Sequence, residues 1–130
     1  MKHTVTLTIT SVLTILCTTF HLTDDIVRGM SPGGLSNLPV VLVLVVWTYG
    51  TLMLAGRRTG YIITLLFSLF SLVVPLVHAQ GKGFGLASRM AHTTGHFFFV
   101  YSLLLIGVLG LFSAILSVRG LWSLPWRRRG

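Results

Sequence analysis

The chain has 130 residues, of which 53% are hydrophobic and 9% are charged, whereas about 25% of the residues in a soluble domain are charged. So few charged side chains cannot cover a water-facing globule, and lipid must therefore cover much of the surface. Basic residues in such chains report membrane orientation first, so the net charge of +8 is not interpreted as a nucleic-acid-binding surface, and no nucleic-acid partner is expected.

Four segments are long and apolar enough to span a bilayer, which takes roughly 20 residues. The predicted helices cover residues 4–26, 38–56, 60–78 and 90–119, and a basic tail follows at 120–130. The apolar core of each helix contains no Asp, Glu, Lys or Arg. The predicted fold is an all-α integral membrane protein, a four-transmembrane-helix antiparallel bundle that forms one domain over residues 1–130.

The first predicted helix shares one property with a signal peptide, since Lys2 precedes an apolar stretch. No cleavage site of small residues follows that stretch. Cys17 is preceded by Leu16, where a lipoprotein signal requires a small residue. We therefore expect the first helix to be retained in the mature protein. The single cysteine excludes a disulfide within the chain.

The distribution of the basic residues predicts how the chain is oriented. Seven of them lie on one side of a four-span arrangement: Lys2, Arg57, Arg58, Arg119, Arg127, Arg128 and Arg129. Three lie on the other side: Arg28, Lys82 and Arg89. This imbalance predicts that both termini are cytoplasmic, in a bacterial-type inner or plasma membrane, and that residues 23–37 and 79–96 face the outside.

The C-terminal tail combines two tryptophans with three arginines, namely Trp122, Trp126, Arg127, Arg128 and Arg129. Aromatic rings favour the headgroup layer, and arginines there attract anionic lipid. We expect the tail to anchor the chain to anionic lipid at the cytoplasmic face. Docking of an acidic partner protein is the alternative function of this tail.

Helical periodicity places polar and small residues on one face of three helices. On the first helix, Thr10, Thr14, Cys17, Asp25 and Arg28 lie on the face of His21. The third helix has Gly60, Thr64, Ser71 and His78 on one face, and the fourth has His92, His96, Leu103, Gly107, Gly110 and Ala114. Lipid offers no hydrogen-bond partner, and small residues let helices approach closely. These faces should therefore meet inside the bundle, with Gly107 and Gly110 as packing positions.

The histidines on these faces gather at the predicted outer ends of the helices. Histidines four residues apart in a helix can share a metal ion, as can a histidine and a carboxylate. The predicted metal ligands are His21, Asp25, His78, His92 and His96, with Asp24 and Cys17 in reserve. Such a mixed nitrogen and oxygen set suits zinc, copper, iron or nickel.

Two other roles for the same residues stay open. Interfacial histidines often serve only as hydrogen-bonding groups that fix helix ends, with Asp24 and Asp25 paired to Arg28. Alternatively, the cluster takes part in proton transfer, because histidine titrates near neutral pH. The rest of the predicted bundle offers no ionisable side chain except Cys17, so a complete proton relay is not expected within one chain.

Three classes of function follow from these interpretations. The first is a transition-metal site facing the extracytoplasmic side, which either binds the metal or uses it in chemistry on an amphiphilic substrate. The second is a non-catalytic accessory subunit of a larger membrane complex. The third is a small proton-coupled transporter that acts as a homo-oligomer. Four-helix multidrug transporters carry a glutamate in their first helix, and this chain contains no glutamate.

Overall fold

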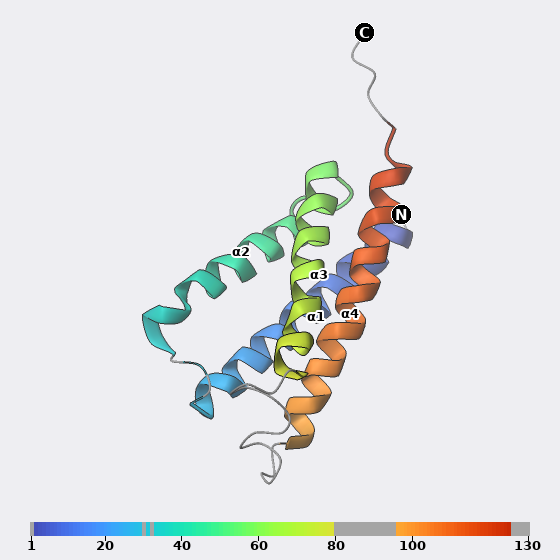
Figure 1. The fold of residues 1–130 in the computed structure, drawn as a ribbon. Helices are drawn as coiled ribbons and strands as arrows, with labels where there is room; N and C mark the ends of the chain where they lie inside the picture. The colour runs from blue at the N-terminus through green and yellow to red at the C-terminus, as the bar shows by residue number, and fades with distance from the viewer. Residues whose placement is uncertain (1, 30, 32, 80–95, 126–130) are drawn as a thin grey trace.

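The computed structural model describes residues 2–29, 31, 33–79 and 96–125 (Figure 1). This part of the chain forms four α-helices and one short 3-10 helix: α1 over Lys2–Val27, η1 over Gly34–Asn37, α2 over Leu38–Leu52, α3 over Arg58–Ala79 and α4 over His96–Ser123. Over the described residues, the prediction of an all-helical fold with four long helices is therefore confirmed.

The observed helices differ from the predicted ones mainly at their ends. α2 ends at Leu52 and not at residue 56, because the chain turns sharply there. In that turn Gly56 has a φ of 75°, which glycine adopts without strain, and the Arg57 N–H donates to the Leu54 carbonyl. α4 continues to Ser123, past the predicted end at residue 119. Residues 90–95 of the fourth predicted helix lie outside the described residues.

All four helices are long and apolar enough to cross a bilayer. Large apolar side chains are exposed on their outer faces, among them Leu66 and Phe70 on α3 and Leu104 and Val108 on α4. Contiguous apolar surface of this extent marks a face that water does not cover. The chain is therefore a membrane protein by the length and composition of its helices. The cytoplasmic location of both termini stays a prediction.

Three of the helices form the closely packed part of the bundle. α4 packs along both α3 and α1, whereas α2 meets α3 near the turn that joins them and diverges from it toward Leu38 (Figure 1). Only 17% of the α2 span is buried, against 44% of the α4 span. The interior of the protein is therefore built mainly by α1, α3 and α4.

The two ends of the bundle carry different groups. The start of α1 meets the start of α3 at the end that holds the α2–α3 turn, where Thr4 Oγ1 lies 3.2 Å from Tyr61 Oη. We call this the turn end. At the opposite end, called the site end, His21 near the end of α1 meets His78 in the last turn of α3. Side chains of α1 and α3 thus contact each other at both ends of the bundle.

Hydroxyl groups line much of the interior between these ends. Among the described residues, ten serines and threonines are buried: Thr10, Ser11, Thr14, Thr51, Thr64, Ser68, Ser71, Ser102, Ser113 and Ser117. Several donate to a carbonyl one turn earlier in their own helix, as Thr14 does to Thr10 over 2.8 Å. Such bonds let hydroxyls occupy a membrane interior, and their small side chains allow the helices to approach closely.

Gly60 and Gly110 are among the glycines that lie in very close contacts. A methyl group at Gly60 would overlap the Leu54 backbone carbonyl, and one at Gly110 would overlap Ser71 Oγ. At Gly107 the nearest atom, Pro75 Cγ, would lie 3.5 Å from such a methyl group, which is ordinary contact. Gly110 thus lies in a tight α3–α4 contact, whereas Gly107 lies in a looser one.

Candidate metal centre

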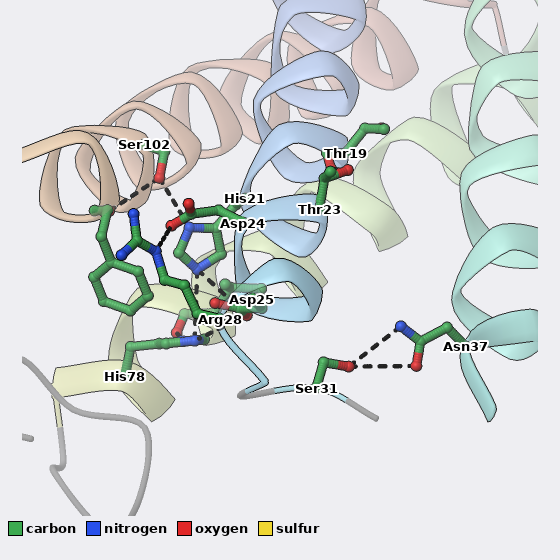
Figure 2. A network of polar contacts seen from close by, with 12 residues as sticks. Thr19, His21, Thr23, Asp24, Asp25, Arg28, Ser31, Asn37, His78 and Ser102 are labelled. Carbon is green, nitrogen blue, oxygen red and sulfur yellow. Dashed lines mark hydrogen bonds and ion pairs between the residues drawn. The ribbon is translucent and has the colours of Figure 1, made fainter. Parts of the chain in front are cut away.

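Three ionisable side chains meet at the site end of the bundle (Figure 2). His21 and Asp25 are one turn apart on α1, and His78 lies in the last turn of α3. All three are largely buried, with exposed fractions of 3%, 8% and 9% in that order. The amphipathic faces of two helices therefore bring together groups that are distant in sequence.

The end of α1 fixes the position of the carboxylate. Gly29 ends the helix with a φ of 70°, and its N–H donates to the Ile26 carbonyl over 3.0 Å. The Ser31 N–H then donates to the Asp25 carbonyl over 3.1 Å. This pattern satisfies carbonyl groups of the last turn, as glycine-based helix ends commonly do. The backbone that carries Asp25 is thus held in place.

The ligand-type atoms of the three residues face one another. The Nε2 atoms of His21 and His78 are 3.5 Å apart. Asp25 Oδ2 lies 3.9 Å from Nε2 of His21 and 3.7 Å from Nε2 of His78. Three potential metal ligands therefore converge on a small volume, and each is farther from the others than the usual 2.7–3.2 Å of a nitrogen–oxygen hydrogen bond.

The second ring nitrogen of His78 determines where its proton lies. His78 Nδ1 is 2.7 Å from the Val74 carbonyl oxygen. A carbonyl can only accept a hydrogen bond, so Nδ1 carries the hydrogen. In the neutral ring Nε2 is then unprotonated and presents a lone pair to the centre of the cluster.

The same reasoning applies to His21 through Ser102 on α4. His21 Nδ1 lies 2.8 Å from Ser102 Oγ, and Ser102 donates its only hydroxyl hydrogen to the Phe99 carbonyl over 2.9 Å. Ser102 must therefore accept the bond from His21, so Nδ1 of His21 is protonated. Figure 2 shows the His21 ring between Ser102 and His78. Its Nε2 atom also presents a lone pair to the cluster.

Neutral imidazoles would consequently leave two lone pairs and a carboxylate facing each other. Asp25 Oδ1 is also buried and has no hydrogen-bond partner among the described residues. A buried carboxylate without partners is costly unless a positive charge accompanies it. A metal ion at the centre, or a proton on an imidazole or on the carboxyl group, would relieve this arrangement.

The surroundings of the cluster favour tight binding of such a cation. Phe99 is fully buried, and its ring centroid lies 4.9 Å from that of His21 and 5.5 Å from that of His78. An apolar wall lowers the local dielectric constant and strengthens electrostatic attraction.

His78 lies beyond the apolar span of α3, which ends at Leu76. Contact with the Asp25 carboxylate raises the pKa of His78, whereas burial of the ring opposes this rise.

The carboxylate of Asp24, the residue before Asp25, forms an ion pair outside the cluster. Asp24 Oδ2 accepts a hydrogen bond of 2.8 Å from Arg28 Nε, one turn later on the same helix. This bond raises the pKa of the Arg28 guanidinium. Asp24 is therefore paired within α1 and does not join the cluster, although it is adjacent to Asp25 in sequence.

The structure brings together three of the predicted ligands: His21, Asp25 and His78. Of the two reserve ligands, Asp24 pairs with Arg28, and half-buried Cys17 lies outside the cluster. His92 lies outside the described residues, as does the side chain of His96, the first residue of α4. In the lipid-anchoring set, Trp122 is 82% exposed near the end of α4, and Trp126, Arg127, Arg128 and Arg129 are also outside the described residues.

Sequence reasoning did not identify Ser102 and Phe99, the two residues of α4 that support the cluster. The predicted face of the fourth helix was centred on His92 and His96, and Ser102 lies to one side of it. A serine six residues after His96 in an otherwise apolar segment was the available signal, because an isolated hydroxyl in a membrane helix has to find a partner.

Comparison of the chain with protein-family models, with curated proteins and with solved structures finds no significant match.

Proposed function

We propose that this protein binds a transition-metal ion through Nε2 of His21, Nε2 of His78 and the Asp25 carboxylate. The observation that carries the proposal is the orientation of the two imidazoles. Each directs its protonated Nδ1 to an outer acceptor, Ser102 or the Val74 carbonyl, and its Nε2 toward the other ligands. Histidine ligands of metals in proteins almost always have such an outer partner for the second nitrogen.

The spacing of the three atoms supports a metal ion over a shared proton. Charge-assisted hydrogen bonds are about 2.7–2.9 Å long, whereas the separations here are 3.5, 3.7 and 3.9 Å. Two ligands that each lie about 2.1 Å from a tetrahedral ion are about 3.4 Å apart. Small side-chain movements would therefore let all three atoms coordinate the same ion.

The donor set indicates the class of metal. Two imidazoles and one carboxylate suit zinc or iron(II), and imidazole-rich sites also bind copper and nickel. Three protein ligands leave at least one coordination position for water, a substrate or a further histidine. His92 and His96 precede Ser102 on the chain, and both stay candidates for that position. A metal with an open position can activate water or polarise a substrate, which is the catalytic form of the proposal.

The location of the cluster supports a site that faces the outside of the cell. The turn end carries the exposed basic residues Lys2, Arg57 and Arg58, which the positive-inside rule assigns to the cytoplasm. The cluster lies at the opposite end of the same helices. An amphiphilic molecule in the outer leaflet would meet a site at this depth.

Metal analysis of purified protein without a histidine tag tests the proposal. After incubation with zinc, iron(II), copper or nickel and desalting, we expect about one ion per chain for at least one of these metals. Asp25→Asn and His78→Ala should lose the ion. The matched control is Asp24→Asn, which changes the adjacent carboxylate and should retain the metal, because Asp24 pairs with Arg28. Folded wild-type protein that binds none of the four metals, or a folded Asp25→Asn variant that binds as the wild type does, would refute the proposal.

A further inference from the structure

Arg28 is the one lysine or arginine that the described part of the chain places at the site end. It directly follows α1, and its N–H donates to the Asp24 carbonyl over 3.0 Å, so the helical geometry continues through it. Long side chains in a helix point back toward its N-terminus and cover the preceding turn. The 2.8 Å bond from Arg28 Nε to Asp24 Oδ2 has this direction (Figure 2). The guanidinium group therefore lies at the level of the two aspartates.

Arg28 also points to the side of α1 that carries two of the proposed metal ligands. It is three positions after Asp25 and seven after His21, and residues with these spacings share one face of a helix. The hydrogen bond from Asp24 is the largest cause of the raised pKa of Arg28, and the charge of Asp25 adds to it. Both the helical register and this electrostatic effect place the guanidinium group beside the cluster.

Most of the hydrogen-bonding capacity of Arg28 is still available. Arginine has five N–H donors, and Nε supplies the one that binds Asp24. No hydrogen bond joins either Nη atom to another described residue. The Arg28 side chain is 25% exposed, whereas that of His21 is 4% exposed. The two Nη groups can therefore bind a ligand that approaches the cluster from outside the bundle.

The position of Arg28 along the helix corresponds to the lipid headgroup layer. The apolar span of α1 ends at Val27, and that of α3 ends at Leu76. Arg28 is thus one residue beyond the first span, and His78 is two residues beyond the second. The polar headgroups of a bilayer lie immediately outside its hydrocarbon core. Phospholipid phosphate groups are consequently the most abundant anions at this depth.

Metal binding would reverse the net charge of this site. With neutral imidazoles, Asp24, Asp25 and Arg28 give the metal-free site one net negative charge, which repels phosphate. A divalent ion bound at the cluster changes the total to one net positive charge, because a bound cation is the largest local charge in such a site. A phosphodiester group carries one negative charge, so it would neutralise the metal-loaded site.

We propose that the metal ion and Arg28 together bind the phosphate group of a phospholipid in the leaflet at the site end. This inference rests on the proposed metal site and names the ligand that the site takes. One phosphate oxygen occupies the open coordination position of the ion. Another accepts hydrogen bonds from the Nη groups of Arg28, since the guanidinium fork matches phosphate geometry. Asp24 is a positioning residue, because it holds the guanidinium group through Nε.

A shared site makes the two ligands dependent on each other. The factor by which the metal raises the affinity for phospholipid must equal the factor by which phospholipid raises the affinity for the metal. Attraction of anionic lipid to the exposed residues Lys2, Arg57 and Arg58 at the turn end would not depend on the metal. Metal dependence therefore separates the proposed site from general attraction of lipid to basic residues.

Native mass spectrometry of the detergent-solubilised protein tests the ligand. The protein is loaded with a metal that it retains after desalting and is titrated with phosphatidylglycerol or with diacylglycerol of the same chain length, which lacks the phosphate. Loaded wild-type protein should bind phosphatidylglycerol at least about tenfold more tightly than diacylglycerol, and metal-free protein should lose most of this preference. Equal binding of the two lipids by loaded protein would overturn the proposal. Displacement of phosphatidylglycerol by an equal concentration of inorganic phosphate would overturn the assignment to a lipid and favour the soluble ion.

Replacement of Arg28 tests its contact with the phosphate. Arg28→Gln should weaken phosphatidylglycerol binding by about tenfold or more, with the metal content unchanged. Arg57→Gln is the matched control, because it removes the same charge from an exposed residue at the turn end and should bind as the wild type does. If Arg28→Gln does not fold, Arg28→Lys keeps the charge without the fork and should bind several-fold more weakly than the wild type.

A double variant separates the guanidinium contact from the net charge. Asp24→Asn combined with Arg28→Gln removes one charge of each sign and keeps the net charge of the loaded site. This variant should still bind phosphatidylglycerol several-fold more weakly than the wild type, and full recovery would overturn the role of Arg28. Metal content distinguishes the failure of this inference from that of the proposed function. A folded chain that retains no metal refutes both, whereas metal-loaded Arg28→Gln with wild-type lipid affinity refutes only the role of Arg28.

Discussion

Replacement of Ser102 by alanine is the most informative single change in the cluster, because it removes a supporting group without removing a ligand. Ser102 Oγ accepts the 2.8 Å hydrogen bond that keeps the proton of His21 on Nδ1. In Ser102→Ala the Nδ1–H group is buried without this acceptor. The other tautomer, with the proton on Nε2, then becomes competitive and blocks the lone pair that the metal needs.

The expected magnitude follows from that geometry. Loss of a buried hydrogen-bond partner costs about 1–3 kcal/mol. Removal of an outer-shell partner from a metal-bound histidine typically weakens affinity by about 10–100-fold, which corresponds to about 1.4–2.7 kcal/mol. We therefore expect the metal dissociation constant of Ser102→Ala to rise by about one to two orders of magnitude, with the stoichiometry unchanged.

Competition against a chromophoric chelator in detergent measures this change. Ser102→Thr should restore most of the affinity, because its hydroxyl can still donate to the carbonyl of its own helix and accept from His21. Ser113→Ala is the matched control, since it removes a buried interhelical hydrogen bond to Thr10 about 16 Å farther along α4. Equal affinities for Ser102→Ala and wild type, in a protein whose His78→Ala variant binds no metal, would refute the assigned tautomer.

Four further predictions concern pH, packing and a buried hydrogen bond. The raised pKa of His78 makes metal affinity increase with pH until His78 is fully neutral, so titrations at several pH values should show weaker binding on the acidic side. In metal-free protein the sign is opposite: protonated His78 stabilises the fold through Asp25, and this contribution is lost as pH rises through the raised pKa, which thermal unfolding followed by circular dichroism detects. Gly60→Ala should lower the unfolding temperature, because its methyl group would overlap a backbone carbonyl, whereas Gly107→Ala should be tolerated. Trp47→Phe should cost about 1 kcal/mol in the free energy of unfolding, measured by denaturant titration, because the indole donates to a buried serine; an unchanged value would contradict that role.

The outline of the fold follows directly from the sequence. Helical periodicity assigned Thr10, Thr14, His21 and Asp25 to one face of the first helix, and all four are buried in the structure. The same argument for the third helix placed His78 on an inward face, and the two helices do bring His21 and His78 together. This success has a physical reason, since lipid forces polar groups of separate helices to find one another.

Other parts of the candidate site depend on how the helices dock. Periodicity gives the direction of a side chain but not its depth or its tilt, so the acceptor role of Ser102 could not be read from spacing. The choice between two adjacent carboxylates also depends on side-chain conformation, because Asp24 pairs with Arg28 whereas Asp25 faces the two imidazoles. Similarly, periodicity within α2 did not predict that this helix diverges from α3 (Figure 1).

The cluster joins α1 to α3 through His21 and His78, which are 57 positions apart in the chain, and this has a consequence for how the protein is assembled. Neither helix carries all three of the proposed ligands, so the proposed binding site is complete only after α3 has been inserted and has packed against α1 in the bilayer. The ion would then stabilise the packed helices, since a ligand that binds only the assembled state stabilises that state by mass action. On the proposed function, a supply of metal would therefore favour the assembled bundle over helices that have not yet packed together.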